Sequence, residues 1–247
     1  MSPDALAMIA VATFLFAGMI KGVVGIGLPT ASIAILAQVT DPRQAIALLL
    51  LPALAANAWQ VYRSGRLLEA VREFWPFAAV MTVGIWIFAR FAVHVPADVL
   101  IIGTGIVIIL FALSSLISKP YALPPAFDLS AQLGAGALAG IMGGLTSIWS
   151  PPMVIYLLAR RLSKDAFVRV TGMLILVGTI PLIIGYMQAG LMTPTLAAYS
   201  AMLILPTWLG FAIGEWMRHR LDAEQFRRIL LIVFFFMGAN LIRRGWF

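Results

Sequence analysis

The sequence predicts an all-α polytopic membrane protein, a helical bundle built from two homologous halves. Of its 247 residues, 62% are hydrophobic and only 11% are charged, and the mean hydropathy is +1.00. A soluble domain carries roughly a quarter charged residues, so a single core cannot bury this much apolar surface and the remainder must face lipid. A membrane-spanning helix needs about 20 mostly apolar residues. Uncharged runs suited to the centres of such helices occupy 44–62, 74–89, 99–118, 129–159, 170–214 and 229–242.

Positive charge lies between these runs rather than within them. The formal net charge is +7 and the pI is near 10.4, values that also occur in nucleic-acid-binding proteins. Here, however, the basic residues cluster in three short connecting segments, as they do in cytoplasmic loops: 63–72, 160–169 and 218–228. We therefore expect a lipid bilayer, and no nucleic acid, around this chain.

The sequence offers little for catalysis or metal binding. It has no cysteine, which excludes disulfides, thiolate metal sites and a cysteine nucleophile. The two histidines, His94 and His219, fall in predicted loops, where we expect them to be solvated. We therefore expect no metal, no cofactor and no enzymatic activity.

The second half of the sequence resembles the first. Residues 17–29 (AGMIKGVVGIGLP) align with residues 139–151 (AGIMGGLTSIWSP), and Val83-Gly84 aligns with Leu209-Gly210. We therefore predict two repeats and a Pro-rich linker within one domain: 1–120, 121–128 and 129–247.

Each half is predicted to hold one interrupted segment followed by three plain helices, which gives eight hydrophobic segments in all. In the first half these are 5–38 (interrupted), 43–62, 73–91 and 98–118. In the second half they are 129–161 (interrupted), 166–187, 195–217 and 224–243.

The interrupted segments are predicted to enter the membrane and return. If all three basic loops are cytoplasmic, the segment 129–161 must begin and end on the same side. Its uncharged run would measure about 46 Å as one helix, which exceeds the roughly 30 Å hydrocarbon core. Gly143-Gly144 and Pro151-Pro152 also oppose a continuous helix. We predict two short helices, 130–143 and 152–161, that meet at a non-helical tip, with 5–38 doing the same from the opposite face.

Three true crossings per half would give the two repeats opposite orientations, as in many secondary transporters. Both chain ends would then lie outside. Arg243 and Arg244 near the outer C-terminus oppose this topology. The alternative is eight plain crossings with parallel repeats.

The two breaks are the candidate binding site. Non-helical backbone at membrane depth is tolerated where it lines a cavity or is buried in protein, and paired breaks in corresponding positions point to a transporter site. Helix N-termini attract anions, and hydroxyl-bearing residues stand at both breaks. The candidate substrate-binding residues are Lys21, Gly25, Gly27, Thr30, Ser32, Asn57, Thr146, Ser147, Trp149 and Ser150.

Several of these polar residues have a structural alternative. Lys21 could contact an anion, or it could snorkel to the interface. Gly18 and Gly22 are better explained by close helix packing. Asn57, with its neighbour Gln60, either bridges helices or lines a path, and so does Asn240.

Three charged residues near the predicted helix ends could act in binding or be structural. Arg43 and Arg169 could guard an anion entrance or be solvated flanking charges. Glu215 is expected to pair with Arg218 three residues later. No proton or sodium relay is visible in the sequence.

The glycine and proline pattern resembles the TauE/SafE family of sulfite and organosulfonate transporters. The resemblance rests on Ala17-Gly18-x-x-x-Gly22-x-x-Gly25-x-Gly27-x-Pro29 and its echo from Ala139-Gly140 to Pro151, and it extends over essentially the whole chain. It implies a small multi-pass permease of the bacterial inner membrane that moves sulfite or other sulfonates. In the echo, Ser147 and Trp149 replace Gly25 and Gly27, which leaves the substrate size undetermined.

The function expected from these features is secondary transport of a small anion, most simply sulfite or an organosulfonate, by alternating access around the two broken segments. An anion channel or a non-transporting membrane subunit is the alternative. Substrate, direction, coupling ion and homo-oligomeric state are left open by the sequence.

Overall fold

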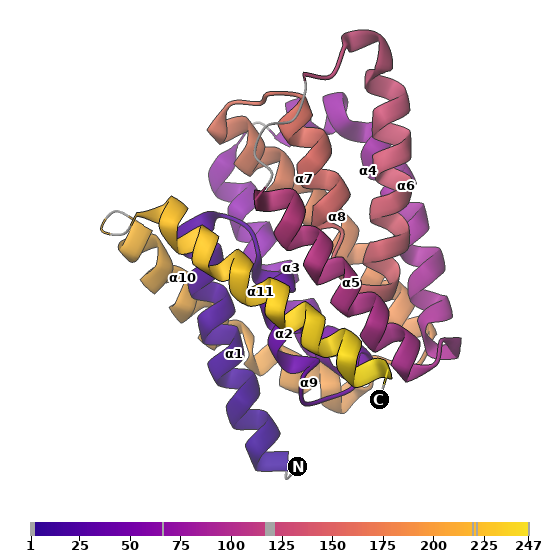
Figure 1. The fold of residues 1–247 in the computed structure, drawn as a ribbon, viewed down its shortest axis with the longest axis vertical. Coiled ribbons are helices and arrows are strands. Elements are labelled where there is room, and N and C mark those ends of the chain that lie inside the picture. Colours follow the sequence, from indigo (N-terminus) through magenta and orange to yellow (C-terminus); the bar gives the residue numbers. More distant parts are fainter. Residues whose placement is uncertain (1–2, 66, 117–121, 219, 221, 247) are drawn as a thin grey trace.

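The computed structural model describes residues 3–65, 67–116, 122–218, 220 and 222–246, and every regular element within them is helical, as predicted (Figure 1). The α-helices are α1 (Pro3–Val24), α2 (Leu28–Leu36), α3 (Pro42–Ser64), α4 (Leu67–Phe91), α5 (Ala97–Leu116), α6 (Asp128–Thr146), α7 (Ser150–Ala159), α8 (Lys164–Gln188), α9 (Pro194–Met202), α10 (Ile204–Arg218) and α11 (Ala223–Trp246). Two 3₁₀ turns, η1 (Ala92–His94) and η2 (Pro125–Phe127), complete the list. His94 thus lies in a connection. His219, residues 117–120 and residue 121 of the predicted linker lie outside the described residues.

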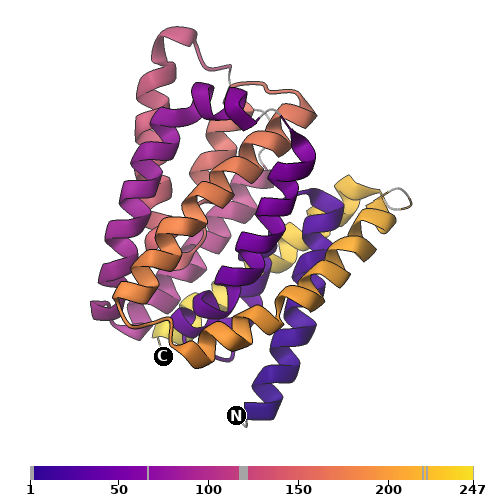
Figure 2. The ribbon, with the colours of Figure 1, turned by 180° about the vertical axis from the view of Figure 1, so that it is seen from behind.

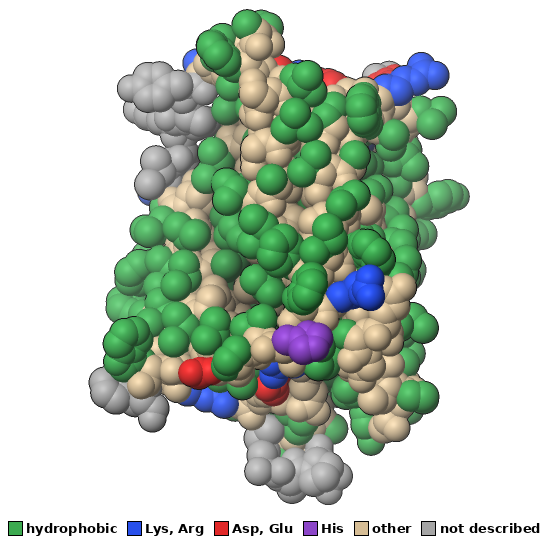
Figure 3. Space-filling view, turned by 90° about the vertical axis from the view of Figure 1, so that its right-hand side faces the viewer, with side chains coloured by type: hydrophobic (Ala, Val, Ile, Leu, Met, Phe, Trp, Pro, Cys, Tyr) green, Lys and Arg blue, Asp and Glu red, His purple; other side chains and the backbone are tan. Residues whose placement is uncertain are grey.

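The outer surface of the bundle is apolar. In the described part of the chain, eight helical segments are long and apolar enough to cross a membrane, which confirms a multi-pass membrane protein. Figure 3 shows hydrophobic side chains over most of one face, with charged side chains mainly toward its upper and lower ends. Because many large apolar side chains are exposed on several helices, this surface suits contact with lipid.

The segment formed by α6 and α7 is a helical hairpin. Its interruption lies at residues 147–149, within the predicted gap, although both helices extend closer to it than predicted. Ser147 adopts a left-handed conformation with φ of 61°, and Pro151 and Pro152 stand in the first turn of α7, where a missing N–H costs nothing. Asp128 at the start of α6 lies 2.7 Å from Arg160 at the end of α7. The hairpin therefore begins and ends on the same side.

The segment formed by α1 and α2 is interrupted in the same way. Gly25 and Gly27 both adopt left-handed φ values, 88° and 105°, which a side-chain-bearing residue would resist. The carbonyl of Ala37, just after α2, accepts a hydrogen bond of 2.6 Å from Arg244 near the end of α11. In both views the N- and C-termini lie toward the lower end of the molecule (Figures 1 and 2), as does the end of α2. Arg244 thus has a structural role at this end.

The three basic loops lie together at the opposite end. Arg160 forms an ion pair of 2.6 Å with Glu73, which joins the 160–169 loop to the beginning of α4. Arg63 forms one of 2.7 Å with Glu215, which joins the end of α3 to the end of α10. This shared end fits the predicted topology and the predicted inverted repeats. The expected pairing of Glu215 with Arg218 is wrong, because the end of α3 brings Arg63 closer.

Each hairpin packs its long helix on a helix of the other half through glycine. On α1, Gly18 and Gly22 contact the backbone of α10, and Gly210 on α10 contacts the carbonyl of Leu15. Gly84 on α4 lies close to Gly140 on α6: a Cβ added to Gly84 would lie 2.9 Å from the Gly140 Cα. In the alignment of the two halves, Gly18 corresponds to Gly140 and Gly84 corresponds to Gly210. The packing interpretation of Gly18 and Gly22 is therefore confirmed.

The predicted helix 195–217 is divided. The structure has α9 and α10 with a break at Leu203. Pro206 explains the position of the break, because it has no N–H to donate to the carbonyl of Met202 four residues earlier. The single-helix prediction is therefore wrong in this detail.

Substituting Gly210 by Ala should destabilise the protein by about 1–3 kcal/mol, because the new methyl group would overlap the Leu15 carbonyl and push α1 and α10 apart. Thermal unfolding of the purified protein in detergent measures this. The matched control is Gly103→Ala on α5, where a Cβ meets nothing within 4 Å. Equal unfolding temperatures for the two variants would contradict the close-packing account.

Candidate functional site

Lys21 is a buried cation at the end of α1. Only 1% of its surface is exposed, so it does not snorkel to the interface. Its Nζ donates to Asn57 Oδ1 at 2.7 Å and to Gln60 Oε1 at 2.6 Å, both on α3. An ammonium has three N–H donors, and the described residues offer no acceptor for the third.

The orientation of the two amides is fixed by their other hydrogen bonds. Asn57 Nδ2 donates to the Ala53 carbonyl at 2.7 Å, and Gln60 Nε2 donates to the Val168 carbonyl at 2.8 Å. Both amide oxygens must therefore face Lys21. Gly172 on α8 leaves room for this arrangement, because a Cβ there would lie 2.9 Å from Gln60 Nε2. Gln60 thus bridges α1, α3 and α8.

The positive charge of Lys21 is not neutralised by a neighbour. Amide oxygens satisfy its donors but carry no net charge, and among the described residues no carboxylate lies within 4.0 Å of Nζ. A buried charge is costly unless it is paired. The site is therefore suited to an anion that supplies the missing charge.

A cavity of about 630 Å³ reaches Lys21 from the end that carries the basic loops. It is formed by the ends of α1, α3 and α10 and the beginning of α8. Its charged lining residues are Lys21, Arg63, Asp165, Arg169, Glu215 and Arg218. Basic side chains outnumber acidic ones, and Glu215 is already paired with Arg63. Lys21 is the innermost of these groups, since Arg63, Asp165 and Arg218 are exposed.

From the first break, the cavity includes Lys21 and Gly25 but not the residues that follow. Gly27, Thr30 and Ser32 are buried outside its lining. Ser32 Oγ donates to the Leu28 carbonyl at 2.7 Å, a bond within its own helix, whereas Thr30 Oγ1 is buried without a partner among the described residues. The N-terminus of α2 therefore does not open into this cavity.

The candidates at the second break lie elsewhere. Thr146 Oγ1 donates to the Met142 carbonyl at 2.7 Å and accepts from the Ile148 N–H at 3.2 Å, so it supports the turn. Trp149 is buried against Gly143, and its Nε1 has no partner among the described residues. Ser147 and Ser150 are also buried. None of these four residues lines the cavity at Lys21.

The remaining polar candidates divide between the cavity and the outer end. Arg169 lines the cavity mouth. Arg43 donates to the Ala92 carbonyl at 3.0 Å and to the Val95 carbonyl, so it fixes the connection between α4 and α5. Asn240 Nδ2 donates to Gln38 Oε1 at 2.7 Å and thereby joins α11 to the segment after α2.

Sequence reasoning missed most of the cavity wall. Trp59, Ser64, Ser163, Val168 and Phe211 line it together with the charged residues. They come from helix ends of both halves, and their proximity depends on how those helices cross. The one available signal was the basic character of the loops that contain Arg63 and Arg218.

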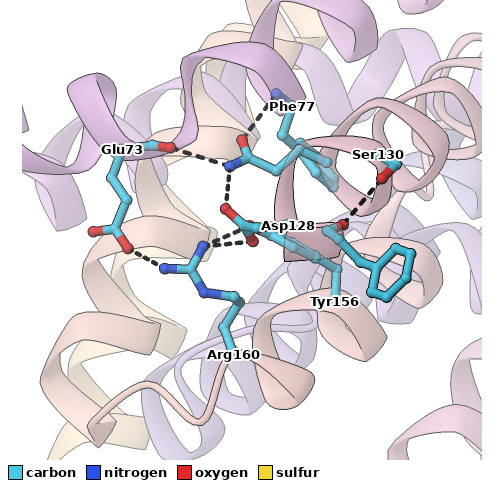
Figure 4. A network of polar contacts seen from close by, with 8 residues as sticks. Glu73, Phe77, Asp128, Ser130, Tyr156 and Arg160 are labelled. Atoms are coloured by element: carbon cyan, nitrogen blue, oxygen red, sulfur yellow. Dashed lines mark hydrogen bonds and ion pairs between the residues drawn. The ribbon is translucent and has the colours of Figure 1, made fainter. Parts of the chain in front are cut away.

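A polar network holds the base of the α6–α7 hairpin (Figure 4). Asp128 accepts hydrogen bonds from Tyr156 at 2.9 Å, from Arg160 at 2.7 Å and from Gln132 at 3.0 Å. Arg160 also reaches Glu73 on α4. The network therefore ties both ends of the hairpin to each other and to α4.

Comparison with known protein families places nearly the whole chain in one of them. Residues 10–241 match the family described as sulfite exporter TauE/SafE. No curated protein and no solved structure shows significant similarity to this chain. In the described residues no group of three or more His, Cys, Asp and Glu side chains is placed to hold a metal ion.

Replacing Asn57 by Leu should destabilise the protein by about 1–3 kcal/mol, because it leaves a buried N–H donor of Lys21 without its acceptor. The same change in a Lys21→Met background should have a smaller effect, since no donor is left to satisfy. Chemical unfolding of the wild type, both single variants and the double variant gives the coupling energy. Additive effects would show that Asn57 does not stabilise the Lys21 amino group.

Replacing Asp128 by Ala should cost about 1–3 kcal/mol, because Tyr156 and Arg160 lose a partly buried acceptor. The matched control is Asp98→Ala, which removes an exposed carboxylate from the first turn of α5 and should cost only about 0.3–1 kcal/mol. Limited proteolysis between residues 122 and 163 should speed up only in the Asp128 variant. Unchanged cleavage would show that the network does not hold the hairpin.

Proposed function

The chain belongs to the sulfite exporter TauE/SafE family, and on this premise we propose that it is a secondary transporter of small anions, with sulfite or an organosulfonate as its substrate. The observation that carries the proposal is Lys21. It is a buried cation without a described carboxylate partner, and it lies at the inner end of a cavity with an excess of basic side chains. The bacterial inner membrane is the location this family implies.

The chemistry of the cavity suits an oxyanion of sulfur. Sulfite and sulfonate groups offer three oxygens that accept hydrogen bonds, and Lys21 has one N–H donor left to give. Arg169 and Arg218 at the mouth raise the local concentration of anions by electrostatic attraction. The volume of about 630 Å³ leaves room for an organic substituent beside Trp59 and Phe211.

The position of Lys21 supports a carrier that works by alternating access. The cavity lies between α1 and α10 on one side and α3 and α8 on the other, and it ends at Lys21. A channel would need a continuous path beyond this point. Relative movement of these two helix pairs would close the present cavity and expose Lys21 to the opposite side of the membrane. The present opening is at the end with the basic loops, which suits entry of the anion from the cytoplasm.

Lys21→Met should abolish anion transport while leaving the protein folded. Uptake of labelled sulfite and methanesulfonate into proteoliposomes measures transport, and thermal stabilisation by the same anions measures binding. The matched control is Arg72→Gln, an exposed basic residue on α4 outside the cavity, which should behave as wild type. Wild-type rates in the Lys21 variant, or no anion movement by the wild type, would overturn the proposal.

A further inference from the structure

We infer that Lys21 carries a proton together with the anion, so that substrate and proton cross the membrane as a pair and the empty carrier returns with Lys21 as a neutral amine. This inference rests on the proposed function and names its coupling ion. The step involves no change in the substrate: a proton binds the lone pair of Lys21 Nζ on one side and leaves it on the other.

The hydrogen bonds around Nζ fit a neutral amine. An amine has two N–H donors and one lone pair, and the structure presents two acceptors, Asn57 Oδ1 and Gln60 Oε1. Because each amide nitrogen is already bound to a carbonyl, neither amide can rotate to offer a different atom. A third proton on Nζ creates a donor that the described protein does not satisfy. An anion oxygen in the cavity satisfies it.

The charges that face Lys21 do not offset its own. On its own helix, α1, it is the only charged side chain with a described position, and α2 has no titratable side chain. The titratable groups that share its cavity from other elements are Arg63 on α3, Asp165 and Arg169 on α8, and Glu215 and Arg218 on α10. Arg227 on α11 lies near the neighbouring Ile20 and Val24.

The two carboxylates in this set do not serve as partners for Lys21. Glu215 is engaged by Arg63 at 2.7 Å, and Asp165 is exposed in the first turn of α8. Arg227 is paired with Glu224 at 3.3 Å. Among the described residues, the empty site therefore has no internal counterion for an ammonium, and a charged group buried in a membrane protein without one is costly.

It follows that proton and anion bind cooperatively. The anion stabilises the ammonium and the ammonium holds the anion, and the coupling must be the same in both directions. A monovalent anion then crosses as a neutral pair with its proton. Affinity for the anion falls as the pH rises, because fewer binding sites hold the proton that the anion requires.

The test is proton uptake on binding and on transport. Methanesulfonate carries no proton at ordinary pH, and sulfite carries none in alkaline buffer, so any proton taken up with them is bound by the protein. Titration calorimetry of the wild type in buffers of different ionisation enthalpy should give close to one proton per anion. In proteoliposomes whose membrane potential is clamped with valinomycin and potassium, inward movement of methanesulfonate or sulfite should acidify the lumen.

Two variants sharpen the test. Lys21→Arg keeps a charge that does not dissociate and should bind the anion without proton uptake and without dependence on pH. Arg72→Gln should retain the wild-type proton count. If the wild type transports the anion without proton uptake, at a rate set by the membrane potential, this inference is overturned. The proposed function would remain intact. If no anion binds or moves in the wild type, both fail.

Discussion

The structure depends on one constraint: interrupted backbone at membrane depth must be enclosed by protein, because lipid offers its free N–H and C=O groups no hydrogen bonds. In the described residues, the interruptions that separate the two helices of each hairpin lie at residues 25–27 and 147–149. Each is enclosed because the long helix before it packs on a helix of the other half. Glycine at Gly18, Gly84 and Gly210 permits these close contacts. The crossed packing of the two halves therefore helps to enclose the breaks.

The same packing positions the candidate site. With α1 held on α10, the last turn of α1 faces α3, and Lys21 meets Asn57 and Gln60. The α10 contact also brings Glu215 to Arg63 at the cavity mouth. Lys21 lies where the two helix pairs meet, so the proposed movement of those pairs would change its contacts. A binding group at this seam can couple occupancy to a change of access.

Local chemistry explains what the sequence predicted well. Glycine and proline set the break positions, and the basic segments identified the end at which the loops gather, because these features act within a few residues of where they stand. The partners of Lys21 could not be predicted in this way. They lie on another helix, and for Lys21 anion contact and snorkelling agreed equally well with the sequence. The pairing of Arg160 with Asp128 and Glu73 was likewise invisible, since it depends on the return of α7 to the start of α6.

The two predicted repeats differ at the candidate site. The residue aligned with Lys21 in the second half is Gly143, and the ring of Trp149 packs where a side chain on Gly143 would stand. The second tip is therefore filled by an uncharged indole, and the charged group occurs once. If the two halves exchange roles between the two access states, as inverted repeats do, Lys21 must serve the anion in both. That requirement favours a group that can lose its charge, because a permanent cation would have to make the return crossing without its counterion.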